Sequence, residues 1–260
     1  MTTAVAPADH RPVTPDLQSL RLRVAVPDPA SHDGEVEVRP HIDGLDVVAE
    51  VFDPEPGLDP RHLLLPGGPL EAGPVPREVC LAEARCTEGC CGALYVTIRL
   101  DGDQVIWGGW RNPDEETVDL PEFRFDARQY RTEVERATSD HSWEWPARTI
   151  ARLLEEELRQ RTDWLERWEC ELSRVAATFR VPDRIELVLF HPGRSAITAG
   201  RPWLQFRLTL AIAGEDPAAE AHRLAEELTA GDPRSAAEVC GGSAEFARAL
   251  GYPWPYRPRR

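Results

Sequence analysis

Alternating apolar and polar positions predict β-strands from the start of the chain. In residues 20–26 the leucines and valines fall on one face and two arginines on the other. Residues 35–42 alternate in the same way. Residues 45–52 continue the pattern after Asp43-Gly44, a dipeptide typical of hairpin turns. The sequence therefore predicts three strands in this region.

A second hairpin is predicted near the middle of the chain. Residues 93–100 and 103–110 are rich in β-branched and aromatic residues and flank Asp101-Gly102. Residues 121–126 have the pattern of a further short strand. These segments extend the β-rich character of the first half of the chain.

The second half of the chain mixes helical and strand patterns. Apolar residues three or four positions apart predict helices, and alternation again predicts strands. Pro146 and Pro217 suit the first turns of two of these helices. The predicted helices are residues 126–138, 142–165, 217–231 and 243–251, and the predicted strands are residues 168–172, 184–190 and 203–213.

This order of elements predicts an α+β protein, with mostly antiparallel sheet and packed helices. Its 260 residues are enough for one large domain or two small ones. The expected parts are a flexible tail (1–18), a β-rich N-terminal subdomain with a cysteine cluster (19–140), an α+β C-terminal subdomain (141–252) and a second tail (253–260).

Residues 53–78 interrupt the strand pattern because they are dense in proline and glycine. Proline lacks the amide donor that a helix interior or a central strand needs, so this segment is predicted to be a long ordered loop. Its apolar centre, Leu63-Leu64-Leu65, is expected to pin the loop to the core. A small-molecule pocket under this loop is one functional option.

The net charge of −15, from 45 acidic residues and 30 arginines, narrows the range of partners. Nucleic-acid binding depends on basic patches, so we expect no nucleic acid partner. An acidic surface instead attracts basic proteins. The alternative is that the charge only keeps the protein soluble.

Membrane and secretory features are not expected. The longest apolar runs have the length of strands and do not approach the roughly 20 residues of a membrane span. The first fifteen residues show no charged start followed by an apolar stretch, so no secretory signal is expected. We therefore expect a cytoplasmic protein without a membrane partner.

Four of the six cysteines lie within twelve residues, at Cys80, Cys86, Cys90 and Cys91. Cys86 and Cys90 have a spacing found in zinc sites, although no second pair follows at the usual distance. Cytoplasmic thiols stay reduced, which favours metal or redox chemistry over a disulfide framework. Three interpretations remain: a structural turn with buried thiols, a structural zinc site, and a redox or disulfide site.

Residues 40–160 resemble a group of uncharacterised actinobacterial proteins. The resemblance rests on the segments DGLDVVAEVF, LLLPGGPLEA, CTEGCCGALYVTIRLDGDQVIWGGWR and HSWEWPARTIARLL, in which a cysteine-and-glycine turn precedes a hairpin ending in tryptophan. The group implies no activity and no catalytic residues. Thr87 and Glu88 stand where some members have a second cysteine and a glycine.

Eight tryptophans are many for a chain of this length. An exposed aromatic patch that anchors a protein partner would use Trp107, Trp110, Arg111, Trp143 and Trp145. The alternative is that the tryptophans pack in the core, with local partners for their indole N–H groups.

Two hypotheses follow. The first is a non-enzymatic cytoplasmic binding or accessory protein, in its specific form an immunity-like protein that binds a basic partner. Under this hypothesis we expect no cofactor and no catalytic residues, since the HExxH and Gly-x-Ser-x-Gly motifs are missing. The second is a zinc- or thiol-dependent enzyme centred on the cluster from Cys80 to Cys91.

Overall fold

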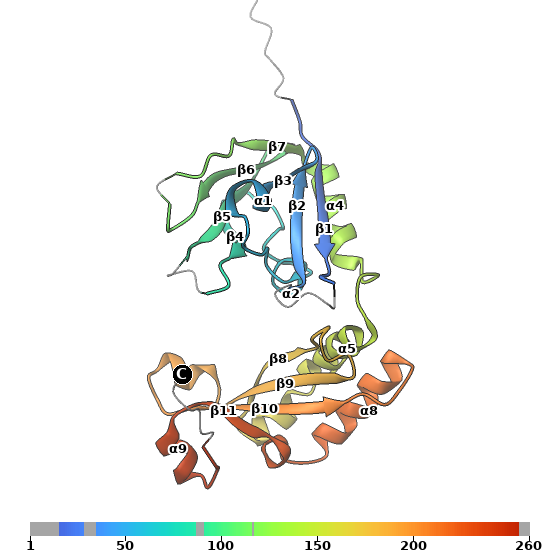
Figure 1. Cartoon of the computed structure of the whole chain (residues 1–260), viewed down its shortest axis with the longest axis vertical. Helices are drawn as coiled ribbons and strands as arrows, with labels where there is room; N and C mark the ends of the chain where they lie inside the picture. The colour runs from blue at the N-terminus through green and yellow to red at the C-terminus, as the bar shows by residue number, and fades with distance from the viewer. Residues whose placement is uncertain (1–15, 29–34, 87–90, 116, 255–260) are drawn as a thin grey trace, which may run out of the picture. The chain divides into compact units, whose positions relative to one another are not determined.

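The computed structural model describes residues 16–28, 35–86, 91–115 and 117–254. It confirms the α+β class, because three antiparallel sheets of three, four and four strands combine with helices. The chain divides into two compact units, Met1–Trp143 (unit 1), with two sheets, and Glu144–Arg260 (unit 2), with one sheet, and each unit has its own apolar core (Figure 1). The boundary predicted from the sequence lies after residue 140. Within the described part of the chain, no helix is long and apolar enough to cross a bilayer.

Unit 1 contains two antiparallel sheets and three described helices. The three-stranded sheet has the order β1-β2-β3, and the four-stranded sheet has the order β4-β5-β6-β7. The strands are β1 (Leu20–Ala25), β2 (Glu37–Ile42), β3 (Leu45–Asp46), β4 (Arg77–Glu83), β5 (Ala93–Asp101), β6 (Gln104–Arg111) and β7 (Phe123–Asp126). The helices are α1 (Val47–Phe52), α2 (Pro60–Leu63) and α4 (Ala127–Ser139).

Backbone hydrogen bonds connect the two sheets of unit 1 at two places. Gln18, which the sequence places in the flexible tail, lies just before β1. Its amide donates to the carbonyl of Arg124 in β7 (2.8 Å) and so connects the start of β1 to β7. At the other place, the Leu58 amide donates to Leu81 of β4 and the Leu58 carbonyl accepts from Val38 of β2, both at 2.9 Å. The strands therefore enclose one apolar core.

Residue 57 lies at this second connection and must be glycine. A Cβ atom on Gly57 would overlap the carbonyl oxygen of Val38. The backbone of the loop can reach both strands only because no side chain stands between them.

The prediction of a strand at residues 45–52 is wrong beyond Asp46. The Asp46 carboxylate accepts hydrogen bonds from the amides of Val48 and Ala49, both at 3.1 Å, and caps helix α1. Helical spacing then buries Val47, Val48 and Phe52 together. N-capping outweighs the strand preference of the valines.

The loop of residues 53–78 reaches the core at two points. Leu63, in α2, is 2% exposed, whereas Leu65 is 45% exposed, so the predicted Leu63–Leu65 anchor holds only in part. Leu70 is the second anchor, with 1% exposure and a carbonyl that accepts a hydrogen bond from the Tyr130 hydroxyl at 2.7 Å.

Helix α4 is fixed to β1 through the carboxylate of Glu133. Figure 1 shows α4 beside β1. Glu133 accepts a hydrogen bond from the Leu22 amide (2.7 Å) and from Arg136 (2.7 Å), and Arg136 donates to the Leu22 carbonyl (2.8 Å). Burial alone would raise the pKa of Glu133, but these hydrogen bonds outweigh it and lower the pKa.

Unit 2 is a single four-stranded antiparallel sheet of order β11-β10-β9-β8, packed against helices. The strands are β8 (Glu171–Ala176), β9 (Arg184–His191), β10 (Leu204–Ala211) and β11 (Glu238–Gly242). The helices are α5 (Pro146–Gln160), α6 (Thr162–Arg167), α7 (Arg194–Thr198), α8 (Pro217–Thr229) and α9 (Ala244–Ala249), with a 3₁₀ turn at Pro233–Ala236.

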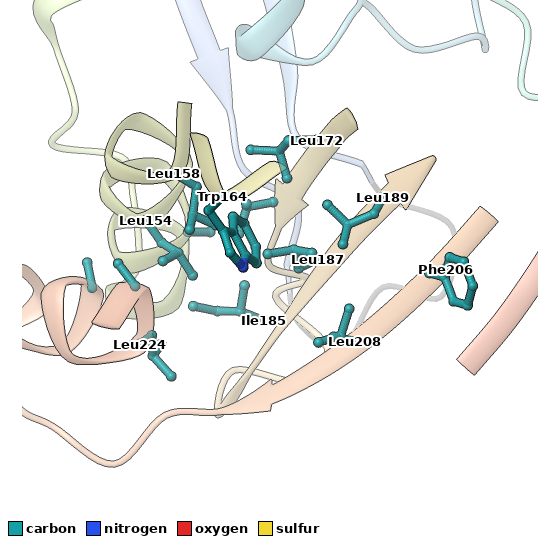
Figure 2. Packing of buried hydrophobic residues seen from close by; sticks show 14 of the residues in the cluster. Leu154, Leu158, Trp164, Leu172, Ile185, Leu187, Leu189, Phe206, Leu208 and Leu224 are labelled. Carbon is teal, nitrogen blue, oxygen red and sulfur yellow. The ribbon is translucent and has the colours of Figure 1, made fainter. Parts of the chain in front are cut away.

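The core of unit 2 lies between this sheet and the helices α5 and α8. Figure 2 shows Leu154 and Leu158 of α5 and Trp164 of α6 gathered over Ile185 and Leu187 of β9. This packing requires alternate residues of β9 to face the helices, as the apolar alternation of residues 184–190 predicts.

Two predicted boundaries in unit 2 differ from the structure. The helix predicted at residues 142–165 begins at Pro146 and ends at Gln160, and α6 follows it after Arg161. The strand predicted from Trp168 begins at Glu171, because Glu169 has a left-handed backbone (φ 50°) that no regular strand contains.

The outer face of the unit 2 sheet carries charges of both signs. Glu186 of β9 pairs with Arg174 (3.3 Å) and with Arg207 (3.8 Å), and Arg207 also approaches Glu238 (3.7 Å). Val188, which is opposite both arginines in the strand register, is 2% exposed. The long arginine side chains beside it can cover this apolar position while their charged groups stay in water.

The carboxylate of Glu220 is the buried acidic group that most affects the pH dependence of unit 2. Its side chain is 3% exposed, accepts from the Ala213 amide (2.9 Å) and pairs with Arg223 (2.6 Å). The hydrogen bond from Arg223 lowers the pKa of Glu220 from 4.5 to about 2, and burial, which acts in the opposite direction, is the weaker effect.

We expect unit 2 to lose stability as the pH falls from about 4.5 towards about 2, because the folded state binds this proton less tightly than the unfolded chain. Glu220→Gln should remove this part of the pH dependence and lower the free energy of unfolding at pH 7 by about 2 kcal/mol. Urea unfolding followed by circular dichroism at several pH values measures both effects. An unchanged acid dependence in the variant would contradict this role.

Candidate functional site

The cysteine segment forms the end of the β4–β5 hairpin. Cys80 lies within β4 opposite Tyr95, and its thiol donates to the Ala82 carbonyl at 3.3 Å. Cys86 and Cys91 are exposed on the two sides of the connection. The Ala84 amide donates to the Gly92 carbonyl at 3.1 Å, so the chain segments that carry these two cysteines start side by side.

The structure does not support a zinc site from the residues it describes. Among them, no group of three or more histidine, cysteine, aspartate or glutamate side chains is arranged to hold a metal ion. Cys90, the fourth predicted ligand, lies outside the described residues. Zinc binding by Cys80, Cys86, Cys90 and Cys91 therefore stays a prediction.

A buried thiol lies outside this cluster, in unit 2. Cys170 is 8% exposed, and burial raises the pKa of its thiol to about 11. A thiol with this pKa is protonated at neutral pH and is a poor nucleophile. Cys170 therefore has the character of an apolar core residue.

The prediction that Trp107 belongs to an exposed aromatic patch is wrong. Its side chain is fully buried, and its indole N–H donates to the Tyr130 hydroxyl at 3.2 Å. The ring also makes edge-to-face contacts with Phe125 (5.8 Å between centroids) and Tyr130 (6.2 Å). The alternative, core packing with a local partner for the N–H, holds for this residue.

Trp110 and Arg111 lie at the end of β6, closer to the surface. The Trp110 indole donates to the Pro121 carbonyl at 2.8 Å and leaves the ring partly exposed. Arg111 makes two hydrogen bonds to Glu78, both at 3.0 Å, and its guanidinium lies 4.1 Å from the centre of the Tyr95 ring. Both residues have the accessibility that a binding surface needs.

Trp143 and Trp145 belong to different units, so only Trp143 shares a unit with Trp110 and Arg111. Trp143 ends unit 1 and donates to the Asp140 carbonyl at 2.8 Å, whereas Trp145 belongs to unit 2. Trp145 packs edge-on against Phe179 at 6.4 Å, and its buried indole nitrogen has no hydrogen-bond partner among the described residues.

Unit 1 has a second, smaller apolar cluster, and acidic residues lie close to its members in the sequence. The cluster contains Val48 and Phe52 of α1 and Leu94 of β5, and the partly exposed Trp110 and Val118 pack around it. Exposed carboxylates follow or precede these residues in the chain. We name this set the acidic surface: Glu50, Asp53, Glu83, Asp114 and Asp119.

Buried Asn112 holds part of the acidic surface in place. It is 5% exposed, and its side-chain oxygen accepts from the amides of Ala93 (3.3 Å) and Asp114 (3.1 Å). Asp114 is thereby kept near the start of β5, where Leu94 belongs to this smaller cluster. No residue of the acidic surface forms an ion pair within the described part of the chain.

The two units differ strongly in net charge. Unit 1 contains 27 acidic residues and 13 arginines, a net charge of −14, and unit 2 contains 18 and 17, a net charge of −1. The charged outer face of the unit 2 sheet is internally paired, whereas the acidic surface of unit 1 is not. The sequence alone gives these net charges, whereas the exposure of the five carboxylates follows from the fold.

The packing of Trp107 gives a testable difference between two neighbouring tryptophans. We expect Trp107→Phe to lower the free energy of unfolding by about 2 kcal/mol, since it leaves a cavity and removes the donor to Tyr130. Trp110→Phe should cost less than about 1 kcal/mol, since that ring is partly solvated. Urea titrations of the two variants measure the difference. Equal effects would mean that the two rings share one environment.

No family model matches the chain, and no curated protein and no solved structure matches it either. The resemblance of residues 40–160 to the actinobacterial group stays a prediction.

Proposed function

We propose that this protein is a non-catalytic binding protein that binds a basic protein partner through the acidic surface of unit 1. The observation that carries the proposal is the separation of charge, with −14 on unit 1 and −1 on unit 2. A basic partner approaching the molecule is attracted by unit 1 and only weakly by unit 2.

The composition of the acidic surface supports this choice. Its carboxylates are exposed and have no ion-pair partners among the described residues, so a partner's arginine or lysine does not have to displace an internal cation. Trp110 and Val118, which pack against the smaller apolar cluster, contribute partly exposed apolar area in the same part of unit 1. An apolar centre with a charged rim is the usual composition of a protein–protein interface, and tryptophan is enriched at its energetic centre.

The specific form of the proposal is an immunity-like role, in which the protein covers the functional surface of a basic toxin. Electrostatic complementarity speeds the association of such pairs and selects the correct partner. The analogy rests on the negative charge of unit 1, since fold alone does not imply function.

Neutralising three carboxylates tests the surface directly. The variant Glu50→Gln, Asp53→Asn, Asp119→Asn should weaken binding of a fluorescent deca-arginine peptide about fivefold, since each lost charge contributes a few tenths of a kcal/mol. The control variant Glu166→Gln, Glu215→Gln, Glu245→Gln changes the net charge equally at exposed positions of unit 2. It should bind the peptide within about twofold of the unsubstituted protein.

A pull-down identifies the natural partner: the same three proteins are immobilised on a resin and incubated with native lysate at low salt. We expect the unsubstituted protein and the control to retain one stoichiometric basic protein that the acidic-surface variant loses. Equal losses in both variants would show that only net charge matters and would overturn the proposed surface. One tightly bound zinc ion per chain, with an activity that chelators abolish, would instead favour the thiol- or zinc-dependent enzyme.

A further inference from the structure

A cavity of about 480 Å³ in unit 1 lies outside the acidic surface. One wall is helix α4, the opposite wall is the segment of residues 65–72, and Leu100 and Val105 from the β5–β6 hairpin close one side. Small-molecule sites in proteins have volumes of about 300–1,000 Å³. The cavity is therefore large enough for a ligand, and all its lining residues belong to one unit.

The cavity follows the length of α4. Its lining residues on the helix recur every three or four positions, so they form one stripe: Ala127, Tyr130, Arg131, Val134, Glu135 and Thr138, with Ser139 at the end. From Ala127 to Ser139 the helix rises about 18 Å. This shape is a groove that suits an elongated molecule.

Apolar side chains form part of the lining of the groove. Leu70, Val105 and Val134 are buried, and the Tyr130 ring lies among them. The Tyr130 hydroxyl already donates to Leu70 and accepts from Trp107, and burial raises the pKa of Tyr130, so this group stays neutral. A hydrocarbon body in the groove would contact apolar atoms without displacing a hydrogen bond.

The mouth of the groove carries a net negative charge. Glu71 and Glu135 are exposed on opposite walls, and neither forms an ion pair within the described residues. Glu71 accepts a hydrogen bond from the Gly67 amide at 2.9 Å, which holds its carboxylate at the rim. Glu135, Thr138 and Ser139 lie in the last turns of α4, where the helix dipole also favours a cation.

Arg131 is the single cation among the lining residues described, against two carboxylates. The surrounding unit has a net charge of −14, which raises the local concentration of cations and repels anions. The charge of the mouth therefore selects a positively charged head group.

We propose that this groove binds an amphipathic amine, with its apolar chain along Leu70, Tyr130 and Val134 and its protonated amine at the mouth between Glu71 and Glu135. The proposal does not depend on the proposed protein partner, because the acidic surface and the groove share no residue.

Three ligands with the same chain and different heads test the charge preference. Isothermal titration calorimetry of the full-length protein, below the critical micelle concentration, compares dodecylammonium, dodecanol and dodecanoate. We expect dodecylammonium to bind at one site per chain and dodecanoate to bind at least about tenfold more weakly, with dodecanol between them. Tighter binding of dodecanoate would show that Arg131 selects an anion and would overturn the proposal.

Variants inside and outside the groove test its location. Val134→Phe fills the floor and should abolish binding of dodecylammonium. Thr138→Phe, at a more exposed lining position, should do the same while leaving the fold intact. Glu135→Gln should weaken dodecylammonium about threefold and leave dodecanol unchanged.

Glu50→Gln is the matched control, because it removes the same charge from the acidic surface. It should leave binding of dodecylammonium unchanged. Two results would show that binding is a general charge effect and that the groove is not the site. One is that Glu50→Gln weakens binding of dodecylammonium as much as Glu135→Gln does. The other is that several dodecylammonium molecules bind to each chain, both in Thr138→Phe and in the unsubstituted protein. Neither result concerns the deca-arginine experiment, so the two proposals fail separately.

Discussion

A chain of two buried hydrogen bonds holds unit 1 together at its centre. The indole of Trp107 in β6 donates to the hydroxyl of Tyr130 in α4, and this hydroxyl donates to the carbonyl of Leu70 in the proline-rich loop. Three segments that are distant in the sequence are thereby connected inside the core. A polar group buried without such partners costs free energy, so the geometry of helix, sheet and loop is fixed jointly. The floor of the α4 groove has its shape because these three segments cannot move independently.

The sequence predicts most of the regular elements because their signals are local. The hairpin of β5 and β6 follows from Asp101-Gly102 between two β-rich runs, and α8 follows from Pro217 and its apolar spacing. Helix α1 was predicted as a strand, since Val47 and Val48 favour strands while the capping effect of Asp46 depends on backbone geometry. Strand β4 was missed because its residues were interpreted only as a cysteine segment.

The candidate sites depend on contacts that local patterns do not contain. The location of Trp107 in the core and of Trp110 near the surface follows from which face of β6 each ring occupies, together with the bulge between β5 and β6. The acidic surface combines residues in or beside α1, β4 and the segment after β6, and each of these segments contributes to or adjoins one small apolar cluster. The sequence alone shows that unit 1 carries nearly all of the net charge, whereas the exposure of these carboxylates follows from tertiary packing.

The connection at Leu58 makes the enclosure of the unit 1 core depend on one position of an otherwise irregular loop. Prolines and apolar residues around it can change while the loop still reaches the core at α2 and Leu70. Gly57 has no such freedom, because even one methyl group there would push β2 and β4 apart. Among substitutions in this loop, replacement of Gly57 is therefore the change that would open the junction between the two sheets of unit 1.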